Sequence, residues 1–171
     1  MQLKPILLAL ALASATAPAL AGGIESFVGK SPSRLLKQEP YFAKAYRAAI
    51  KDQDLPDWTK RLAVGFPAEH IVIDGKTTFL MSACNPQSGC GEERLYLLYV
   101  PDEQSVIGFF FLPPNDAAPG DHRMALSRWI GKELPPPKSR SDFLMQRAMQ
   151  DTQEKQDAPN SERSTNAPAK N

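Results

Sequence analysis

The chain has 171 residues, and its 20 Lys and Arg residues nearly balance its 19 Asp and Glu residues, giving a formal net charge of +1. This balance argues against a nucleic-acid-binding protein or a polybasic membrane-binding protein, because both need an excess of basic residues. The two cysteines exclude a cysteine-rich zinc module and a scaffold with several disulfides.

Residues 1–21 have the order of a secretory signal peptide. Lys4 supplies a positive charge, an apolar run follows from Ile6 to Ala13, and Ala19-Leu20-Ala21 forms a small-residue cleavage site. A membrane-spanning helix would need about 20 continuous apolar residues, and polar residues and a proline interrupt the run earlier. No cysteine follows the cleavage site, which argues against a lipoprotein anchor. We therefore expect a periplasmic protein without membrane insertion, whose mature chain has lost Lys4 and carries no net charge.

The first predicted helix covers residues 41–50. Its apolar residues recur at helical spacing, and Pro40 suits the first turn. The segment Leu55-Pro56-Asp57-Trp58 ends this helix and can start a short second helix through Leu62. We expect residues 64–67 to form a connector.

The residue pattern then changes to that of strands. His70-Ile71-Val72-Ile73 and the segment 76–81 flank Asp74-Gly75, which is the signature of a type I′ hairpin turn. Two further strand-like segments, 94–100 and 106–112, are joined by a short turn. Four strands with short connections predict an antiparallel meander. Together with the helices they predict a single-domain α+β fold.

After this sheet, prolines break the pattern, and Asp121 is placed to cap another helix. The apolar residues of that predicted helix are Met124, Ala125, Leu126, Trp129 and Ile130. A helical extension is expected within residues 135–150, as an amphipathic segment from 139 onward. Residues 151–171 contain no large apolar residue. We expect them to be a disordered tail, because they bury too little apolar surface to offset the entropy of ordering.

The connection between the second and third predicted strands contains both cysteines, Cys84 and Cys90. In an oxidising compartment they are free to pair. Such a bond closes a very small ring, and on chain-entropy grounds it would stabilise the fold by only about 2–3 kcal/mol. A tight ring fixes the shape of the loop it encloses, and Pro86 removes further freedom. Pre-ordering a protruding loop lowers the entropic cost of inserting it into a partner, so we interpret the segment as a rigid recognition loop.

Two other interpretations of the cysteine loop stay open at this point. The disulfide could be a clip that only stiffens a connection between strands. The cysteines could instead form a redox-active dithiol. Against that interpretation, the pair lacks Cys-x-x-Cys spacing and has no Lys, Arg or His between the sulfurs to lower a thiol pKa.

The sequence around the cysteines resembles the Ivy family, the periplasmic inhibitors of vertebrate (C-type) lysozyme. The resemblance rests on Met-Ser-Ala-Cys ending at Cys84, a proline two residues later, and Cys-Gly at Cys90 followed by two polar residues and Arg94. Leu55-Pro56-Asp57-Trp58 matches a Leu-Pro-x-Trp element of the family, and the hydrophobic strands follow in the expected order. The resemblance covers about residues 40–134, after a lead-in of residues 22–39.

The resemblance implies an α+β domain, often dimeric, whose disulfide-closed loop enters the lysozyme cleft. In the family loop, Cys-Lys-Pro-His-Asp-Cys, the His reaches the catalytic carboxylates. In this sequence Asn85 stands for the Lys, Pro86 is kept, Gln87 stands for the His, Ser88 stands for the Asp, and Gly89 is an added residue. Gln87 and Ser88 can donate hydrogen bonds but carry no charge, so we expect inhibition to be weaker by roughly tenfold or more.

We therefore predict a periplasmic inhibitor, not an enzyme, whose target-binding loop comprises Asn85, Pro86, Gln87, Ser88 and Gly89, closed by a disulfide between Cys84 and Cys90. The expected partner is a C-type lysozyme or another muramidase or lytic transglycosylase, and a homodimer is compatible with the resemblance. The alternatives are an Ivy-like scaffold that binds another envelope protein and a thiol-redox protein that uses the two cysteines. No cofactor is expected.

The remaining polar residues do not predict a further site. His70 and His122 lack a third ligand, so no metal site is expected. Glu92-Glu93 reads as a solvated acidic turn, because adjacent strand residues point to opposite faces. The aromatic residues Tyr96, Tyr99 and Phe109-Phe110-Phe111 predict a sheet core with some exposed aromatic surface that could serve dimerisation.

Overall fold

The computed structural model describes residues 23–87, 90, 93–111, 127–132 and 134–162, with side chains described as far as residue 151. In this part of the chain, five antiparallel strands lie side by side in sequence order. The strands are β1 (Val64–Ile73), β2 (Lys76–Cys84), β3 (Arg94–Val100), β4 (Ser105–Phe111) and β5 (Arg128–Gly131). The helices are α1 (Pro32–Gln38), α2 (Pro40–Ile50) and α3 (Lys138–Glu162), with the short 3-10 helices η1 (Ile24–Ser26), η2 (Asp57–Lys60) and η3 (Pro101–Glu103). The predicted α+β fold with an antiparallel meander is confirmed, with one strand more than predicted.

The β1–β2 hairpin has the turn that its sequence predicts. Asp74 has a φ of 52° and Gly75 a φ of 73°, and a type I′ turn requires positive φ at both central residues. Ile73 accordingly pairs with Lys76. The turns at Asp74-Gly75 and at η3 therefore lie at one end of the sheet, called the hairpin end. The β2–β3 connection lies at the other end, called the loop end.

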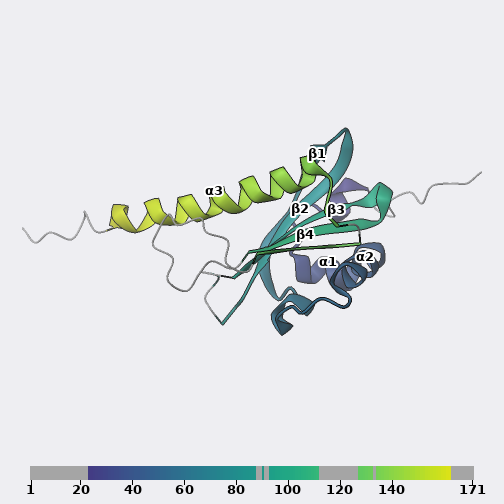
Figure 1. Cartoon of the computed structure of the whole chain (residues 1–171), viewed down its shortest axis with the longest axis horizontal. Helices are drawn as coiled ribbons and strands as arrows, with labels where there is room; N and C mark the ends of the chain where they lie inside the picture. The colour runs from purple at the N-terminus through teal and green to yellow at the C-terminus, as the bar shows by residue number, and fades with distance from the viewer. Residues whose placement is uncertain (1–22, 88–89, 91–92, 112–126, 133, 163–171) are drawn as a thin grey trace, which may run out of the picture.

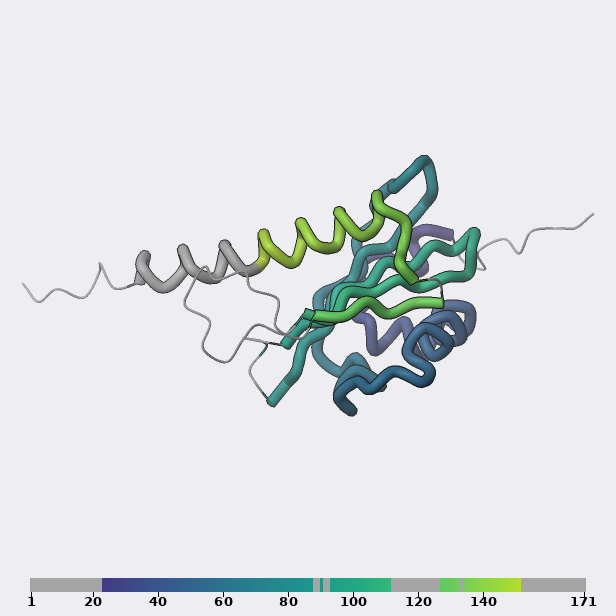
Figure 2. Tube along the Cα trace, in the orientation of Figure 1, coloured from purple at the N-terminus to yellow at the C-terminus, as the bar shows by residue number. Residues whose placement is uncertain are grey.

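Helices cover both faces of the sheet, so the molecule has three layers (Figures 1 and 2). Side chains of α1 and α2 share one hydrophobic cluster with Leu97 and Tyr99 of β3. The intervening residues of β3, Tyr96 and Leu98, point to the opposite face and share a second cluster with Leu144 of α3. All seven residues of β3 are buried, as expected for a strand that is covered on both faces.

The β3 and β4 residues predicted to provide some exposed aromatic surface do not form one. Five aromatic side chains of β3 and β4 are all buried; they are Tyr96, Tyr99, Phe109, Phe110 and Phe111. The prediction was wrong because helices cover both faces of the sheet. Tyr96, Phe109 and Phe111 pack on the α3 side, whereas Tyr99 and Phe110 pack on the side of α1 and α2. Burial raises the pKa of both tyrosines to about 12. These residues are core and are not available for dimerisation.

β1 begins six residues earlier than predicted. The segment 64–67, expected to be a connector, pairs with the end of β2, with Val64 opposite Cys84. The register shifts between Phe66 and Glu69, and Pro67 lies in this irregular part of an edge strand, where a residue without a backbone N–H is tolerated. The strand was not predicted over residues 64–67 because a proline within a segment argues against a strand. β1 therefore reaches the cysteine loop.

The helix predicted to span Trp129 and Ile130 is wrong in its described part, because residues 128–131 form β5. β5 covers the free edge of β4, and the Trp129 ring packs on Phe109 with their centroids 4.6 Å apart. β5 can lie this close to β4 because residue 108 is a glycine. A Cβ at Gly108 would lie only 2.5 Å from Ile130 Cγ1. The predicted cap Asp121 and the residues to 126 lie outside the described residues.

The lead-in of residues 22–39 contains two short helices, η1 and α1, that were not predicted from the sequence. Ser31 caps α1 by accepting a hydrogen bond from the Arg34 backbone N–H at 3.4 Å. Before it, Phe27 is buried, and its ring stacks on Phe79 of β2 with a centroid separation of 4.5 Å. The lead-in therefore contributes to the core.

α3 is longer than the predicted helix of residues 139–150, since it continues to Glu162 through residues assigned to a disordered tail. Asp151, the first residue beyond the predicted end, is held by two ion pairs. The Asp151 carboxylate pairs with Arg147 Nε at 3.2 Å, one helical turn away, and with Arg94 Nη1 of β3 at 3.0 Å. The prediction of a disordered tail considered only apolar residues, so it could not detect these ion pairs.

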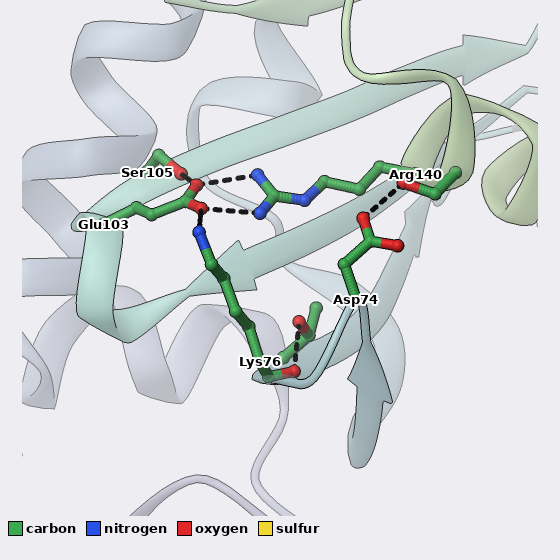
Figure 3. A network of polar contacts seen from close by, with 7 residues as sticks. Asp74, Lys76, Glu103, Ser105 and Arg140 are labelled. Atoms are coloured by element: carbon green, nitrogen blue, oxygen red, sulfur yellow. Dashed lines mark hydrogen bonds and ion pairs between the residues drawn. The ribbon is translucent and has the colours of Figure 1, made fainter.

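Ion pairs hold the first turn of α3 to the hairpin end (Figure 3). The Glu103 carboxylate accepts two hydrogen bonds from Arg140, both at 2.6 Å, one from Lys76 at 2.6 Å and one from Ser105 at 3.0 Å. The Arg140 side chain is only 6% exposed. The Arg140 guanidinium holds the pKa of Glu103 down at about 2, against an ordinary 4.5. The hairpin end is therefore built around buried charge.

Candidate functional site: the cysteine loop and its base

The two cysteines form a disulfide at the loop end. Cys84 is the last residue of β2 and is buried, whereas Cys90 is half-buried in the connection to β3. Their Cα atoms lie 4.9 Å apart across a sequence separation of six residues. The bond therefore closes the small ring that the sequence allows, and it joins two parts of one loop.

Pro86 and Gln87 are exposed on this ring, while Asn85 is half-buried at its base. The Gln87 backbone N–H donates to Asn85 Oδ1 at 2.9 Å, and the Cys90 N–H donates to the Asn85 carbonyl at 3.1 Å. The first bond is an Asx turn, in which an Asn side chain fixes the direction of the chain two residues later. Three predicted loop residues therefore lie together, and Ser88 and Gly89 lie outside the described residues.

Glu93 closes the base of the loop, contrary to the sequence-based expectation of a solvated acidic turn. Its Oε2 accepts hydrogen bonds from Trp58 Nε1 at 2.8 Å and from Asn85 Nδ2 at 3.1 Å. Its backbone carbonyl accepts from the Asn85 N–H at 3.2 Å. The expectation was wrong because it considered only the alternation of strand faces and overlooked a donor distant in sequence. Glu92 lies outside the described residues.

Trp58 lies at the base of the cysteine loop, a position that the sequence does not predict for it. It lies in η2, is 9% exposed, and its ring packs against Phe110 at a centroid distance of 6.2 Å. A buried indole N–H needs an acceptor, and that requirement was the available signal for a polar partner. The sequence does not show that this partner is Glu93, 35 positions away.

The one cation at the start of β3 is already neutralised. Arg94 is buried, bonds Asp151, donates to Tyr96 Oη at 3.4 Å and lies over the Phe66 ring at 5.9 Å. A guanidinium held in this way cannot reach out to a partner. The exposed residues Pro86 and Gln87 of the ring therefore offer uncharged hydrogen-bonding groups.

Other predicted features contribute no chemistry to the described site. His70 lies in the middle of β1, with its ring 5.9 Å from the Phe79 ring, and His122 lies outside the described residues. Within the described ranges no cluster of three or more potential metal ligands exists. Over the same ranges, none of the helices combines the length and apolarity needed to cross a membrane.

Comparison with known proteins identifies the family. The sequence model of the family described as "Inhibitor of vertebrate lysozyme (Ivy)" matches residues 41–150, which is more than half of the chain and includes both cysteines, Trp58 and Glu93. The chain belongs to the Ivy family. Ivy proteins inhibit vertebrate lysozyme and are periplasmic.

A second comparison finds a relative of this Ivy protein in Pseudomonas aeruginosa. It is an uncharacterized protein, 29% identical over 99 residues. The match covers 55% of this chain and 63% of the relative. The resemblance seen at the cysteine loop is thus confirmed as family membership, while the target of this chain is a separate question.

Proposed function

We propose that this Ivy protein inhibits C-type lysozyme, or a related muramidase or lytic transglycosylase, by inserting the disulfide-closed loop 84–90 into the active-site cleft of its target. It acts as a binding protein and not as an enzyme, and it is exported to the periplasm by the signal peptide of residues 1–21. The observation that carries the proposal is the exposed Pro86-Gln87 segment on a covalently closed ring at the end of the sheet. A loop ordered before binding has less conformational entropy to lose on entering a cleft.

Gln87 is the residue that we assign to the catalytic carboxylates of the target. Lysozymes of this type cleave with two carboxyl groups, and a glutamine amide offers two N–H donors and no positive charge. A hydrogen bond between a neutral donor and a carboxylate leaves out the second charge that a protonated histidine would add. We therefore expect binding weaker by about tenfold than that of a loop with a charged donor.

The test measures inhibition constants of the purified mature protein against a panel of a C-type lysozyme, other muramidases and lytic transglycosylases. Gln87→Ala is expected to weaken inhibition by about tenfold. The matched control is Gln38→Ala, which removes an exposed glutamine of α1 and leaves inhibition unchanged. Gln87→His is expected to strengthen inhibition at pH 5 relative to pH 8, because imidazole is charged below about pH 6.5.

Two results would contradict the proposal. Inhibition that is unchanged both in Gln87→Ala and in Cys84→Ser/Cys90→Ser would remove the loop from the mechanism. A lack of inhibition of every enzyme in the panel would overturn the assigned target class and favour another envelope partner. A disulfide reduction potential well above about −300 mV would favour redox chemistry at the cysteines.

A further inference from the structure

We propose that a polar lock centred on Glu93 holds the cysteine loop together with its disulfide, so that the loop keeps much of its inhibitory shape when the disulfide is reduced. The polar lock consists of Trp58, Glu93, Asn85 and the backbone N–H of Gln87. The inference rests on the proposed function only for its inhibition readout. Glu93 is a positioning residue in this scheme, because it acts on Gln87 through Asn85.

The polar lock begins at a single carboxylate oxygen. Trp58 Nε1 and Asn85 Nδ2 both donate to Glu93 Oε2, at 2.8 and 3.1 Å. Glu93 is half-buried, and hydrogen bonds to an ionised group are stronger than bonds between neutral groups. Two donors from different segments therefore converge on one charged acceptor.

The donor on the far side is fixed to the core. The Trp58 ring is buried against Phe110. The residue after it, Thr59, is buried, and its carbonyl accepts a hydrogen bond from Tyr46 Oη of α2 at 2.7 Å. Because Trp58 is held in this way, its indole N–H is a donor of fixed position for Glu93, and it lies outside the loop.

Asn85 transmits that position to the exposed segment. Its Nδ2 is bonded to Glu93, while its Oδ1 accepts the Gln87 backbone N–H at 2.9 Å. One side-chain amide thus has different partners at its two ends, which fixes its orientation. Loss of the Glu93 carboxylate would remove the acceptor of Asn85 Nδ2 and would loosen the direction of the chain at Gln87.

The disulfide and the polar lock restrict different motions. The disulfide joins Cys84 to Cys90 and limits the size of the ring. The polar lock ties the base of the ring to η2 and so limits its direction relative to the sheet. Constraints on one loop are not additive. Either one alone leaves much of the order in place, and loss of both frees the loop.

The first experiment measures inhibition of a purified C-type lysozyme by loop variants whose far-UV circular dichroism at the assay temperature matches that of the folded parent protein. We expect Cys84→Ser/Cys90→Ser to weaken inhibition about threefold, Glu93→Ala about tenfold, and the combination several hundredfold instead of the roughly thirtyfold of independent effects. Glu93→Gln keeps an acceptor oxygen and is expected to stay within about threefold of the parent. The matched control is Glu25→Ala, at an exposed glutamate.

The second experiment does not depend on inhibition. Hydrogen exchange of the Gln87 backbone N–H and of the Trp58 indole N–H is followed by NMR in the protein with its disulfide formed. We expect both to exchange about tenfold faster or more in Glu93→Ala. Trp58→Phe keeps a ring against the core but lacks the donor, and it serves as a second variant with the same expected result at Gln87.

The outcomes separate the two proposals. If the parent protein inhibits no enzyme, the proposed function fails, and the exchange rates still decide on the polar lock. Unchanged exchange at Gln87 in both Glu93→Ala and Trp58→Phe would overturn the polar lock. Faster exchange with full inhibition would overturn its role in positioning. If the combined variant weakened inhibition only by the product of the two separate effects, the disulfide and the polar lock would act independently, which would contradict the proposal.

Discussion

The two ends of the sheet are fastened by different chemistry. At the hairpin end, Glu103 meets the buried Arg140 and also Lys76, and these ion pairs hold α3 to the sheet. At the loop end, a disulfide and the hydrogen bonds of Glu93 hold a short segment whose exposed residues Pro86 and Gln87 are uncharged. The comparison indicates that the hairpin end holds a helix on the sheet, while the loop end fixes the shape of an exposed surface.

The largest effect on stability is expected at the hairpin end. Glu103→Gln should lower the free energy of unfolding by about 2–3 kcal/mol, because it leaves the Arg140 charge buried without its counter-charge. Urea unfolding checks this value. Lys138→Gln, which breaks an ion pair with Asp142 that is exposed on both sides, should change stability by less than about 0.5 kcal/mol. Inhibition should be unaffected by either variant, and a loss in Glu103→Gln no larger than in the control would break the comparison.

The disulfide should contribute both to stability and to inhibition, whereas Glu103 contributes to stability alone. Cys84→Ser/Cys90→Ser is expected to cost about 2 kcal/mol of stability, because the bond closes a loop of only a few residues. The same urea experiment measures the change, and the mutant should retain the far-UV circular dichroism of the parent. A complete loss of folded structure would show that the loop end supports the whole sheet and not only itself.

Acid should weaken the hairpin end by a smaller amount. The pKa of Glu103 is lowered from 4.5 to about 2, chiefly by its bonds to Arg140. A depressed folded-state pKa contributes stability that is fully present above about pH 4.5 and is lost as the pH falls towards 2. Since the Glu103 side chain is 30% exposed, screening reduces the contribution to about 1–2 kcal/mol.

Urea midpoints between pH 5 and pH 2.5 test this contribution. Stability should fall more steeply with acidification in the parent protein than in Glu103→Gln, which has no carboxyl group to protonate at that position. Equal slopes in the two proteins would mean that other carboxyl groups determine the acid response.

Local signals in the sequence were enough for the sheet but not for its edges. Asp74-Gly75 predicts its own turn because both residues tolerate positive φ. β5 is only four residues long, and Trp129 and Ile130 fit a helix pattern equally well. Their pairing with β4 depends on the space that Gly108 leaves, and no local pattern records such a packing requirement.

The candidate site was also predictable only where local sequence determines it. Cys84 and Cys90 predict a small ring, and the residues between them predict which groups it presents. The base of that ring depends on Trp58 and Glu93, which meet only after α2, β1 and β2 have been placed. Contacts between residues so far apart in sequence depend on the whole fold, so Glu93 reads as an ordinary surface acid until the fold is known.

The placement of the disulfide within a single loop also bears on how this bond forms. The chain contains two cysteines, so only one intramolecular pairing exists, and oxidation has no incorrect isomer to correct. The two residues are six positions apart, and ring closure over so short a stretch is entropically cheap before the sheet forms. Oxidation can therefore precede or follow folding, and maturation of this chain should need a thiol oxidant but no disulfide isomerase.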